Sequence, residues 1–120
     1  MTSLMPNPDF IYKIVSGPAF DAARSAGVFP LMPIDLKDGY IHLSTAAQLA
    51  ETLRLYFAGE SNVVVFAVRS SDLDDLRWEP SRGGQLFPHA YGEVNVSAVG
   101  KPATLSVPPD GSVSLPDWVR

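Results

Sequence analysis

The chain has 120 residues, of which 46% are hydrophobic and 18% are charged, and its formal net charge is -4. A chain of this length is expected to form one domain, residues 1–120, and can bury a hydrophobic core without disulfides or a structural metal. Cysteine is absent, which excludes disulfides, thiolate metal sites and a cysteine nucleophile. The 9 basic residues are spread singly along the chain, so we do not expect tight non-specific binding to nucleic acid.

Residues 1–6 lack the basic and apolar regions of a signal peptide, and no apolar run approaches the ~20 residues of a membrane span. We therefore expect a cytoplasmic protein that does not enter a membrane. The core is expected to span about residues 10–105, between a flexible start and a tail that Trp118 pins to the surface. The sequence leaves the oligomeric state open.

The first quarter of the chain predicts a strand followed by a short helix. Residues 10–15 are rich in aromatic and β-branched side chains, which are typical of a strand. Residues 18–26 have helical spacing, with a cap at 16–17 and a stop at Gly27. Two prolines make residues 28–33 a connecting loop, and its residues 29–33 are either an exposed apolar patch for self-association or a lid over a cleft.

Residues 38–45 are the most informative segment, because they place a ring nitrogen and hydroxyls at the end of a predicted strand. Side chains alternate faces in an extended chain, so Tyr40, His42 and Ser44 face one way and the apolar residues between them face the other. One face of this strand is therefore apolar, and the other can carry chemistry.

A helix is expected directly after this strand. Thr45 and Gln48 have the spacing of a capping box, and Gly59 is the expected stop for a helix over residues 46–57. The apolar residues of this helix recur at four-residue spacing, which predicts that it lies against a sheet: Leu49, Leu53 and Phe57.

The second half of the chain predicts mainly strands. Residues 63–68 are an unbroken apolar run, typical of a strand buried on both faces. Residues 70–76 indicate a turn or a single helical turn, residues 77–79 an extended segment, and residues 81–84 a Gly-rich loop.

The last predicted elements are a half-buried strand and an edge strand. Residues 93–99 alternate apolar with polar side chains, which predicts the half-buried strand, and residues 104–107 predict the edge strand. The expected fold class is therefore α+β, in one domain.

Several polar residues are candidates for a site. His42 and His89, together with Glu79, could bind ribose hydroxyls or act as acid and base. Arg82, in the Gly-rich loop, offers a planar set of donors to a phosphate. The alternative is that each histidine is structural and that Ser44 and Thr45 are helix caps. The histidines are 47 residues apart and form no local metal-ligand motif, so we expect no metal site.

Four segments together resemble a known family: residues 11–14, 39–45, 78–79 and 87–92. The chain resembles, over about residues 10–105, a family of small bacterial and plant proteins catalogued as a domain of unknown function. Members of that family are considered similar in fold to ADP-ribosyltransferases and RNA 2'-phosphotransferases. Some members are named glutathione S-transferases, but 120 residues are too few for the two domains of such an enzyme. The resemblance implies a split β-sheet core with about two short helices and a cleft for a nucleotide-like ligand.

The resemblance also implies roles for particular residues. The strand with His42 and Ser44 would support the nicotinamide side of the cleft, and Tyr12 and Lys13 would occupy the first-strand position. The catalytic candidates are His42, His89 and Glu79, and the ligand-binding candidates are Tyr12, Lys13, Ser44, Thr45, Arg82 and Tyr91.

Two functions remain open from the sequence. One is an ADP-ribosyltransferase-like enzyme that acts on NAD or a related ribonucleotide, with NAD as substrate rather than as a resident cofactor. The other is a non-catalytic module that binds a nucleotide or another small molecule. A purely structural protein, whose cleft binds nothing, is the third reading.

Overall fold

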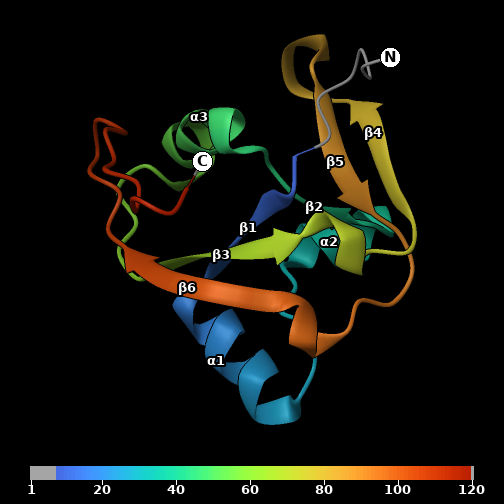
Figure 1. Cartoon of the computed structure of the whole chain (residues 1–120). Helices are drawn as coiled ribbons and strands as arrows, with labels where there is room; N and C mark the ends of the chain where they lie inside the picture. The colour runs from blue at the N-terminus through green and yellow to red at the C-terminus, as the bar shows by residue number, and fades with distance from the viewer. Residues whose placement is uncertain (1–7, 120) are drawn as a thin grey trace.

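Two three-stranded antiparallel sheets form the centre of the computed structural model, which describes residues 8–119 (Figure 1). The flexible start that the sequence predicts lies largely outside these residues. The first sheet has the order β1-β3-β6, with strands Phe10–Ser16, Val63–Arg69 and Val99–Leu105. The second has the order β2-β5-β4, with strands Ile41–His42, Leu86–Ala90 and Leu76–Pro80.

Three α-helices and three short 3-10 turns connect the strands. The helices are α1 (Gly17–Ala26), α2 (Pro33–Asp38) and α3 (Ala46–Phe57), and the turns are η1 (Ser70–Asp72), η2 (Arg82–Gly84) and η3 (Val96–Ala98). These elements confirm the expected α+β class in a single domain. No helix of the described residues has the length and apolar character needed to cross a membrane.

The ends of α1 and α3 follow local capping chemistry. The Ser16 side chain accepts a hydrogen bond from the Ala19 amide (3.2 Å), and Gly27 ends α1 in the left-handed conformation, at φ 70°. The Thr45 hydroxyl accepts from the Gln48 amide (3.2 Å), while the Gln48 side chain accepts from the Thr45 amide (3.0 Å). The predicted N-terminal caps of both helices and the Gly27 stop of α1 are confirmed, whereas the C-cap of α3 is Ala58, one residue before the predicted Gly59.

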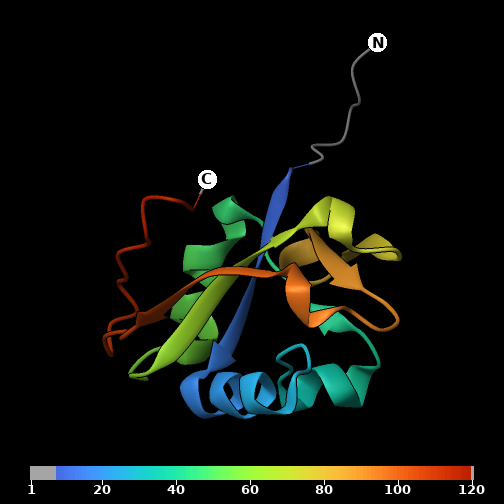
Figure 2. The same cartoon turned by 60° about the horizontal axis from the view of Figure 1, so that its bottom comes forward.

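Helices α1 and α3 cover opposite faces of the first sheet. Alternate residues of β3 pack with Phe20 of α1 on one face and with Leu49 and Leu53 of α3 on the other. This arrangement explains why residues 63–68 are all buried, as their unbroken apolar sequence predicts. Figure 2 shows α1 and α2 along one edge of the molecule.

The two sheets meet at one bridge. The Tyr12 amide donates to the Ser44 carbonyl (2.8 Å), and the Ser44 amide donates to the Tyr12 carbonyl (2.9 Å). This bridge joins β1 to the segment between β2 and α3. It therefore holds Lys13 of the first sheet beside His42 of the second.

Three expectations require correction. Residues 93–99 form a loop and the turn η3 instead of a half-buried strand, and the edge strand begins earlier than residue 104, at Val99. The helix α2 was not predicted. Residues 29–33 do not form an exposed apolar patch, because Phe29 and Pro30 are buried and the Phe29 ring packs edge-on against Phe66 at 5.6 Å.

Residues 106–119, after β6, contain no helix or strand but pack onto the core. Val107 is buried, and the Trp118 ring lies 6.1 Å from the Tyr12 ring. The tail is therefore held against the first sheet on the α3 side, as the sequence suggests for Trp118.

Candidate functional site

The candidate site lies on the outer face of the second sheet. Cross-strand pairing sets His42 opposite His89 and His89 opposite Arg77. The neighbouring row, Ile41, Ala90 and Leu76, packs into the core on the other face. The alternation predicted for residues 40–44 is confirmed: the apolar row packs into the core, and the chemistry-bearing row lies on the opposite face, where His42 is partly exposed and Ser44 and His89 are buried.

Tyr40 lies over both histidines. Its ring centroid is 4.6 Å from that of His42, 4.3 Å from that of His89 and 5.2 Å from that of Tyr91. The two imidazole rings are 5.5 Å apart. Residues 47 positions apart in the sequence thus form one aromatic cluster.

His89 is oriented by a carboxylate. It is 3% exposed, and its Nδ1 lies 2.8 Å from Oε1 of Glu79. The Tyr91 hydroxyl donates to the same oxygen at 2.7 Å. These hydrogen bonds, that of Tyr91 first and that of His89 second, lower the pKa of Glu79, and the carboxylate in turn raises the pKa of Tyr91.

His42 is oriented by a different, buried carboxylate. Oδ1 of Asp35 lies 2.8 Å from Nδ1 of His42 and accepts from the His42 amide at 2.9 Å. Oδ2 of Asp35 accepts from the Met32 amide (2.7 Å) and lies 2.7 Å from Nζ of Lys13. Lys13 also donates to the His42 carbonyl at 3.1 Å. A buried Lys-Asp-His chain therefore fixes both the ring and the backbone of His42.

The Lys13–Asp35 pair is almost fully removed from solvent, with side-chain exposures of 2% and 1%. Burial favours the neutral carboxyl of Asp35, but the hydrogen bonds of His42 and the charge of Lys13 outweigh it and lower the Asp35 pKa to about 2. Burial lowers the pKa of Lys13, and the neighbouring Asp35 opposes that shift. Asp35 is therefore an ionised carboxylate at neutral pH.

A second carboxylate of α2 contacts the outer nitrogen of His42. Oδ2 of Asp38 lies 3.0 Å from Nε2, and both side chains are partly exposed, at 27% for His42 and 33% for Asp38. Desolvation, followed by the charges of Asp38 and Glu79, raises the pKa of Tyr40. The Tyr40 hydroxyl thus stays protonated between these groups.

Hydroxyl groups and a guanidinium stand at the α3 side of the site. Nη1 of Arg82 donates to Oγ1 of Thr52 at 3.1 Å, and the Arg82 guanidinium lies 4.9 Å from the centroid of the Phe87 ring. The Ser44 and Thr52 hydroxyl oxygens are 3.4 Å apart, and Thr52 donates to the Gln48 carbonyl. These contacts leave most Arg82 donors unused among the described residues.

These groups surround one cavity of about 380 Å³. Its polar lining includes His42, His89, Asp38 and Arg82, and its apolar lining comes from β1, the α2 region, α3 and the second sheet. The apolar and aromatic lining residues are Tyr12, Ile14, Met32, Ile34, Tyr40, Leu43, Tyr56, Phe57 and Phe87. A concave, mostly apolar space with a few convergent polar groups is typical of a small-molecule site.

The structure brings most of the predicted site residues to this cavity. Six of them line it: Tyr12, Lys13, His42, Ser44, Arg82 and His89. Glu79 and Tyr91 are not among the lining residues and lie behind His89, where they hold its Nδ1 side. Thr45 is not among the lining residues either, and its hydroxyl caps α3.

Sequence reasoning missed Asp35, Asp38 and Thr52 as site residues, and it placed Tyr40 on the correct face without naming it as a candidate. One signal for the two aspartates was present. Pro33 at a helix start, with Asp35 two residues later and Gly39 as the stop, is typical of a short capped helix. A helix that ends at Asp38, only four residues before His42, would have suggested that the Asp38 carboxylate lies near the His42 ring.

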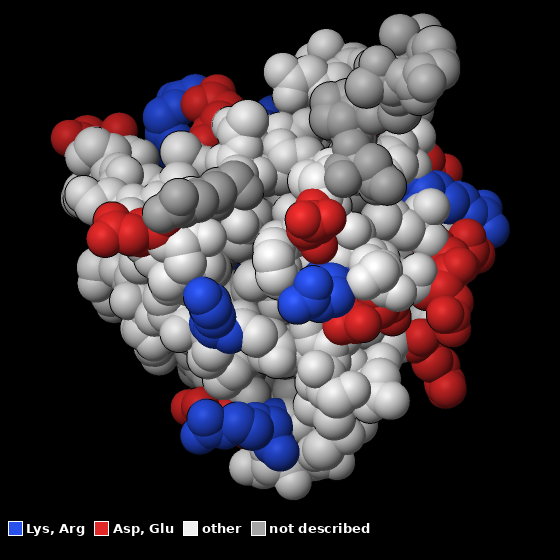
Figure 3. Space-filling model, viewed as in Figure 1, with Lys and Arg blue, Asp and Glu red and all other residues white. Residues whose placement is uncertain are grey.

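The face of the molecule in Figure 3 has no continuous basic stripe, and its Lys and Arg side chains appear as separate groups. Acidic side chains gather at one edge of the same view. Within residues 8–119, no group of three or more His, Asp or Glu side chains is arranged to hold a metal ion.

The chain matches the family model described as "Protein of unknown function (DUF952)" over residues 14–101. It is also similar to protein CC0527 from Caulobacter crescentus. The crystal structure of CC0527 has 44% sequence identity and a TM-score of 0.79, and the match covers 88% of this chain and 93% of CC0527. The solution NMR structure of CC0527 has 45% identity and a TM-score of 0.75, with 87% and 90% covered. No curated protein matches the chain.

Proposed function

The chain belongs to the family described as a protein of unknown function (DUF952), and we propose that it binds a small ribonucleotide, NAD or a related molecule, in the cavity between the histidines and Arg82. The proposal includes turnover of the ADP-ribosyltransferase type, with His89 as the group that contacts a ribose hydroxyl. Glu79 orients His89 and does not touch the ligand itself.

One observation carries this proposal: the outer nitrogen of His89 is unused. Nδ1 faces Glu79, and Nε2 has no hydrogen bond within the described residues. Every fully buried side-chain nitrogen and oxygen of these residues has a partner. Nε2 is therefore not fully buried. Because the rest of the His89 ring is buried and His89 lines the cavity, we take the cavity as the space that Nε2 faces. An oriented imidazole with one free nitrogen suits a ligand hydroxyl.

The rest of the cavity supports a ligand with an anionic group and a flat ring. Arg82 lies beside the hydroxyls of Ser44, Thr52 and Ser81, a combination of donors that suits a phosphate. Ile34 and Tyr56 add apolar surface on which a base or a nicotinamide could lie. A volume of about 380 Å³ falls in the lower part of the range of small-molecule sites, roughly 300–1,000 Å³.

The ADP-ribosyltransferase-like character is supported by the sheets. Such a fold implies a split β-sheet core, and the chain has two separate three-stranded sheets with the cavity beside their junction. His42 and Ser44 lie at this junction, and Lys13 supports His42 from the first sheet. These are the positions that the resemblance assigns to the nicotinamide side of the cleft.

Binding without turnover is the second candidate, and one observation favours it. Asp38 occupies Nε2 of His42, so only one of the two histidines presents a free nitrogen to the cavity. A non-catalytic module would bind the same ligands in the same cavity and would release them unchanged.

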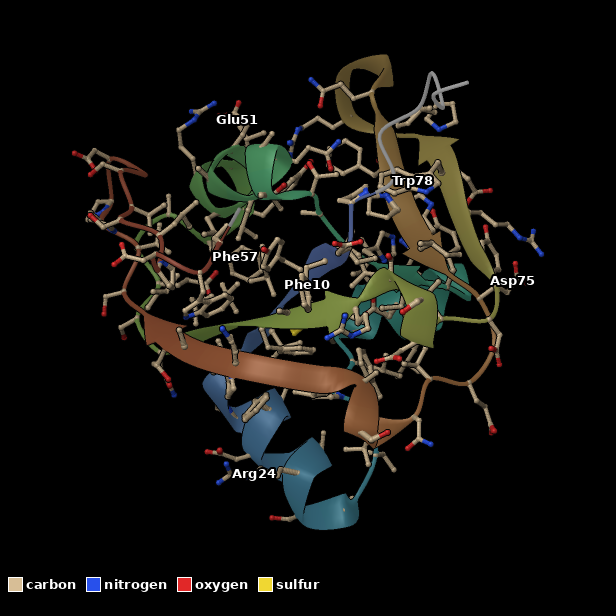
Figure 4. All side chains as sticks on the ribbon, in the orientation of Figure 1. Phe10, Arg24, Glu51, Phe57, Asp75 and Trp78 are labelled. Carbon is tan, nitrogen blue, oxygen red and sulfur yellow. The ribbon has the colours of Figure 1, made fainter. Side chains whose placement is uncertain are left out.

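Calorimetric titration with NAD, ADP-ribose, nicotinamide and a short 2'-phosphorylated RNA tests the proposal. We expect saturable binding of at least one ribonucleotide, weakened at least tenfold in Arg82→Gln and His89→Gln. Arg24→Gln is a matched control, because Arg24 is not among the residues that line the cavity. It lies on α1, away from the second-sheet strand β4 that carries Trp78 (Figure 4). No binding of any of the four compounds by the folded wild-type protein would refute the proposal. Chromatography of the incubated ligand then separates turnover from binding alone.

A further inference from the structure

A second hollow, which we call the α2 groove, is formed within residues 28–31, 35–41, 72–74 and 90–95 and has a volume of about 980 Å³. Among the described residues, Tyr40 alone lines both this groove and the cavity of the candidate site. We infer that the α2 groove binds a basic segment of a partner protein, in which aliphatic side chains alternate with lysine or arginine. The inference does not rest on the proposed function, because the groove and the cavity have separate linings.

The floor of the α2 groove is apolar. Phe29, Ile41 and Ala90 are buried members of the hydrophobic core and line the groove. Leu36 and Val28 line it too, although they are 73% and 51% exposed. Single exposed apolar side chains are normal on a protein surface, but here exposed and buried apolar residues share one concave surface. Apolar side chains of a partner that cover this surface would be stabilised by its removal from water.

The same groove carries uncompensated negative charge. Asp72, Asp74 and Glu93 line it and are exposed, and none of them takes part in an ion pair within residues 8–119. No lysine or arginine is among the lining residues that the structure describes. Figure 3 shows acidic side chains gathered at one edge of the molecule, on the side where Figure 4 labels Asp75, the residue after Asp74. Such a field favours a cationic partner and raises its association rate.

The apolar floor and the acidic rim together select the occupant. Nucleic acids and anionic membrane surfaces carry negative charge, which the three carboxylates repel. A second copy of this chain is disfavoured, because each copy has a net charge of -4. A small organic cation matches the rim but leaves much of the floor uncovered. A basic protein segment with aliphatic side chains satisfies both, in the way that amphipathic segments bind apolar grooves.

Fluorescence anisotropy titrations with labelled model peptides test the inference. The first peptide contains only lysine and leucine, the second has serine in place of each leucine, and the third has glutamate in place of each lysine. We expect saturable binding of the lysine-leucine peptide, and binding of the other two that is weaker by about tenfold or more. The affinity of the first peptide should fall as the salt concentration rises, because the rim carboxylates are exposed.

Two variants of the groove locate the binding. Asp74→Asn combined with Glu93→Gln removes two rim charges, and Leu36→Ser removes an apolar side chain that is mostly exposed. Each variant should weaken binding of the lysine-leucine peptide by about fivefold or more. All three side chains are exposed, so both variants should remain folded, which circular dichroism checks.

The matched controls lie outside the groove. Asp21→Asn combined with Glu60→Gln makes the same change in net charge, and Leu55→Ser removes an exposed leucine of α3. Both controls should bind the lysine-leucine peptide as the wild type does. An equal loss in the groove variants and in their controls would overturn the inference.

Three further results would also overturn the inference. One is the absence of saturable binding of the lysine-leucine peptide by the folded wild-type protein. Another is equal binding of the lysine-serine peptide, since charge alone would then explain the affinity. The third is binding of 1,4-diaminobutane as tight as that of the peptide, because the groove would then be a site for small cations.

Discussion

Replacing Asp35 by Asn should strongly destabilise the protein. The substitution keeps the shape of the side chain but removes the charge that faces Lys13, whose side chain is 2% exposed. The Lys13 ammonium would then be buried, and among the described residues the His42 carbonyl, at 3.1 Å, would remain as its hydrogen-bond acceptor. Removing one partner of a buried ion pair costs about 3–5 kcal/mol. Such a loss is a large part of the ~5–15 kcal/mol that stabilises a typical domain.

The matching variant Lys13→Met should cost less than Asp35→Asn. The carboxylate left behind still accepts from the amides of Met32 and His42 and still contacts Nδ1 of His42, so its charge remains solvated by hydrogen bonds. The double variant should cost less than the sum of the two single variants, with a coupling of about 1–3 kcal/mol. Asp38→Asn, on the same helix but partly exposed, is the control and should change stability by less than about 1 kcal/mol.

Urea unfolding followed by circular dichroism and by tryptophan fluorescence measures these differences, provided that the slope of the transition stays constant. A loss below about 1 kcal/mol for Asp35→Asn would refute the description of this pair as a buried, charged anchor of His42. Strict additivity of the two substitutions would refute their direct coupling.

Three further predictions concern single groups. The pKa of Asp35 is about 2, against 3.8 for an ordinary aspartate, so its ionisation stabilises the fold by about 2 kcal/mol above roughly pH 4. That contribution should disappear as the pH falls toward 2, and acid titration of Asp35→Asn should lack it. Tyr91→Phe should raise the pKa of Glu79, measured by carboxyl NMR, because it removes the hydroxyl that lowers this pKa most; an unchanged pKa would contradict the assigned bond. Thr45→Ala should cost about 1 kcal/mol in urea unfolding, since it removes the cap of α3; no loss would contradict the capping role.

The elements that the sequence predicted correctly have strong local signals. The strand β3 is an unbroken apolar run, and α3 begins at a complete capping box. Helix α2 escaped prediction because its six residues give too few turns for a periodic pattern, and Ile34 and Leu36 are mostly exposed, at 52% and 73%. A helix held by Asp35 and not by an apolar face leaves little trace in hydrophobic periodicity.

The wrong prediction at residues 93–99 has a physical cause. Their alternation suits a strand, but a strand also needs a partner edge, and the free edge of β3 pairs with β6 from Val99 onward. Val96 is correspondingly 40% exposed. Alternation alone could not show which of two neighbouring segments would pair.

The candidate site was predicted only in part, because its residues are brought together by contacts between separate elements. Both histidines were identified from their local segments, but only the register of β2 with β5 makes them cross-strand partners. The buried anchor of His42 combines Lys13 on β1 with Asp35 on α2, which are 22 positions apart. Contacts between separate elements depend on tertiary packing, which no local pattern encodes.

The most direct test of the central claim is to follow the two histidine ring signals by NMR during titration with NAD and with ADP-ribose. We predict that both rings shift saturably for at least one of these ligands, with the same dissociation constant that calorimetry gives, and that Arg82→Gln weakens both shifts together. Ring signals that do not move up to millimolar concentrations of both ligands, in a protein that remains folded, would contradict a ribonucleotide site between His42 and His89.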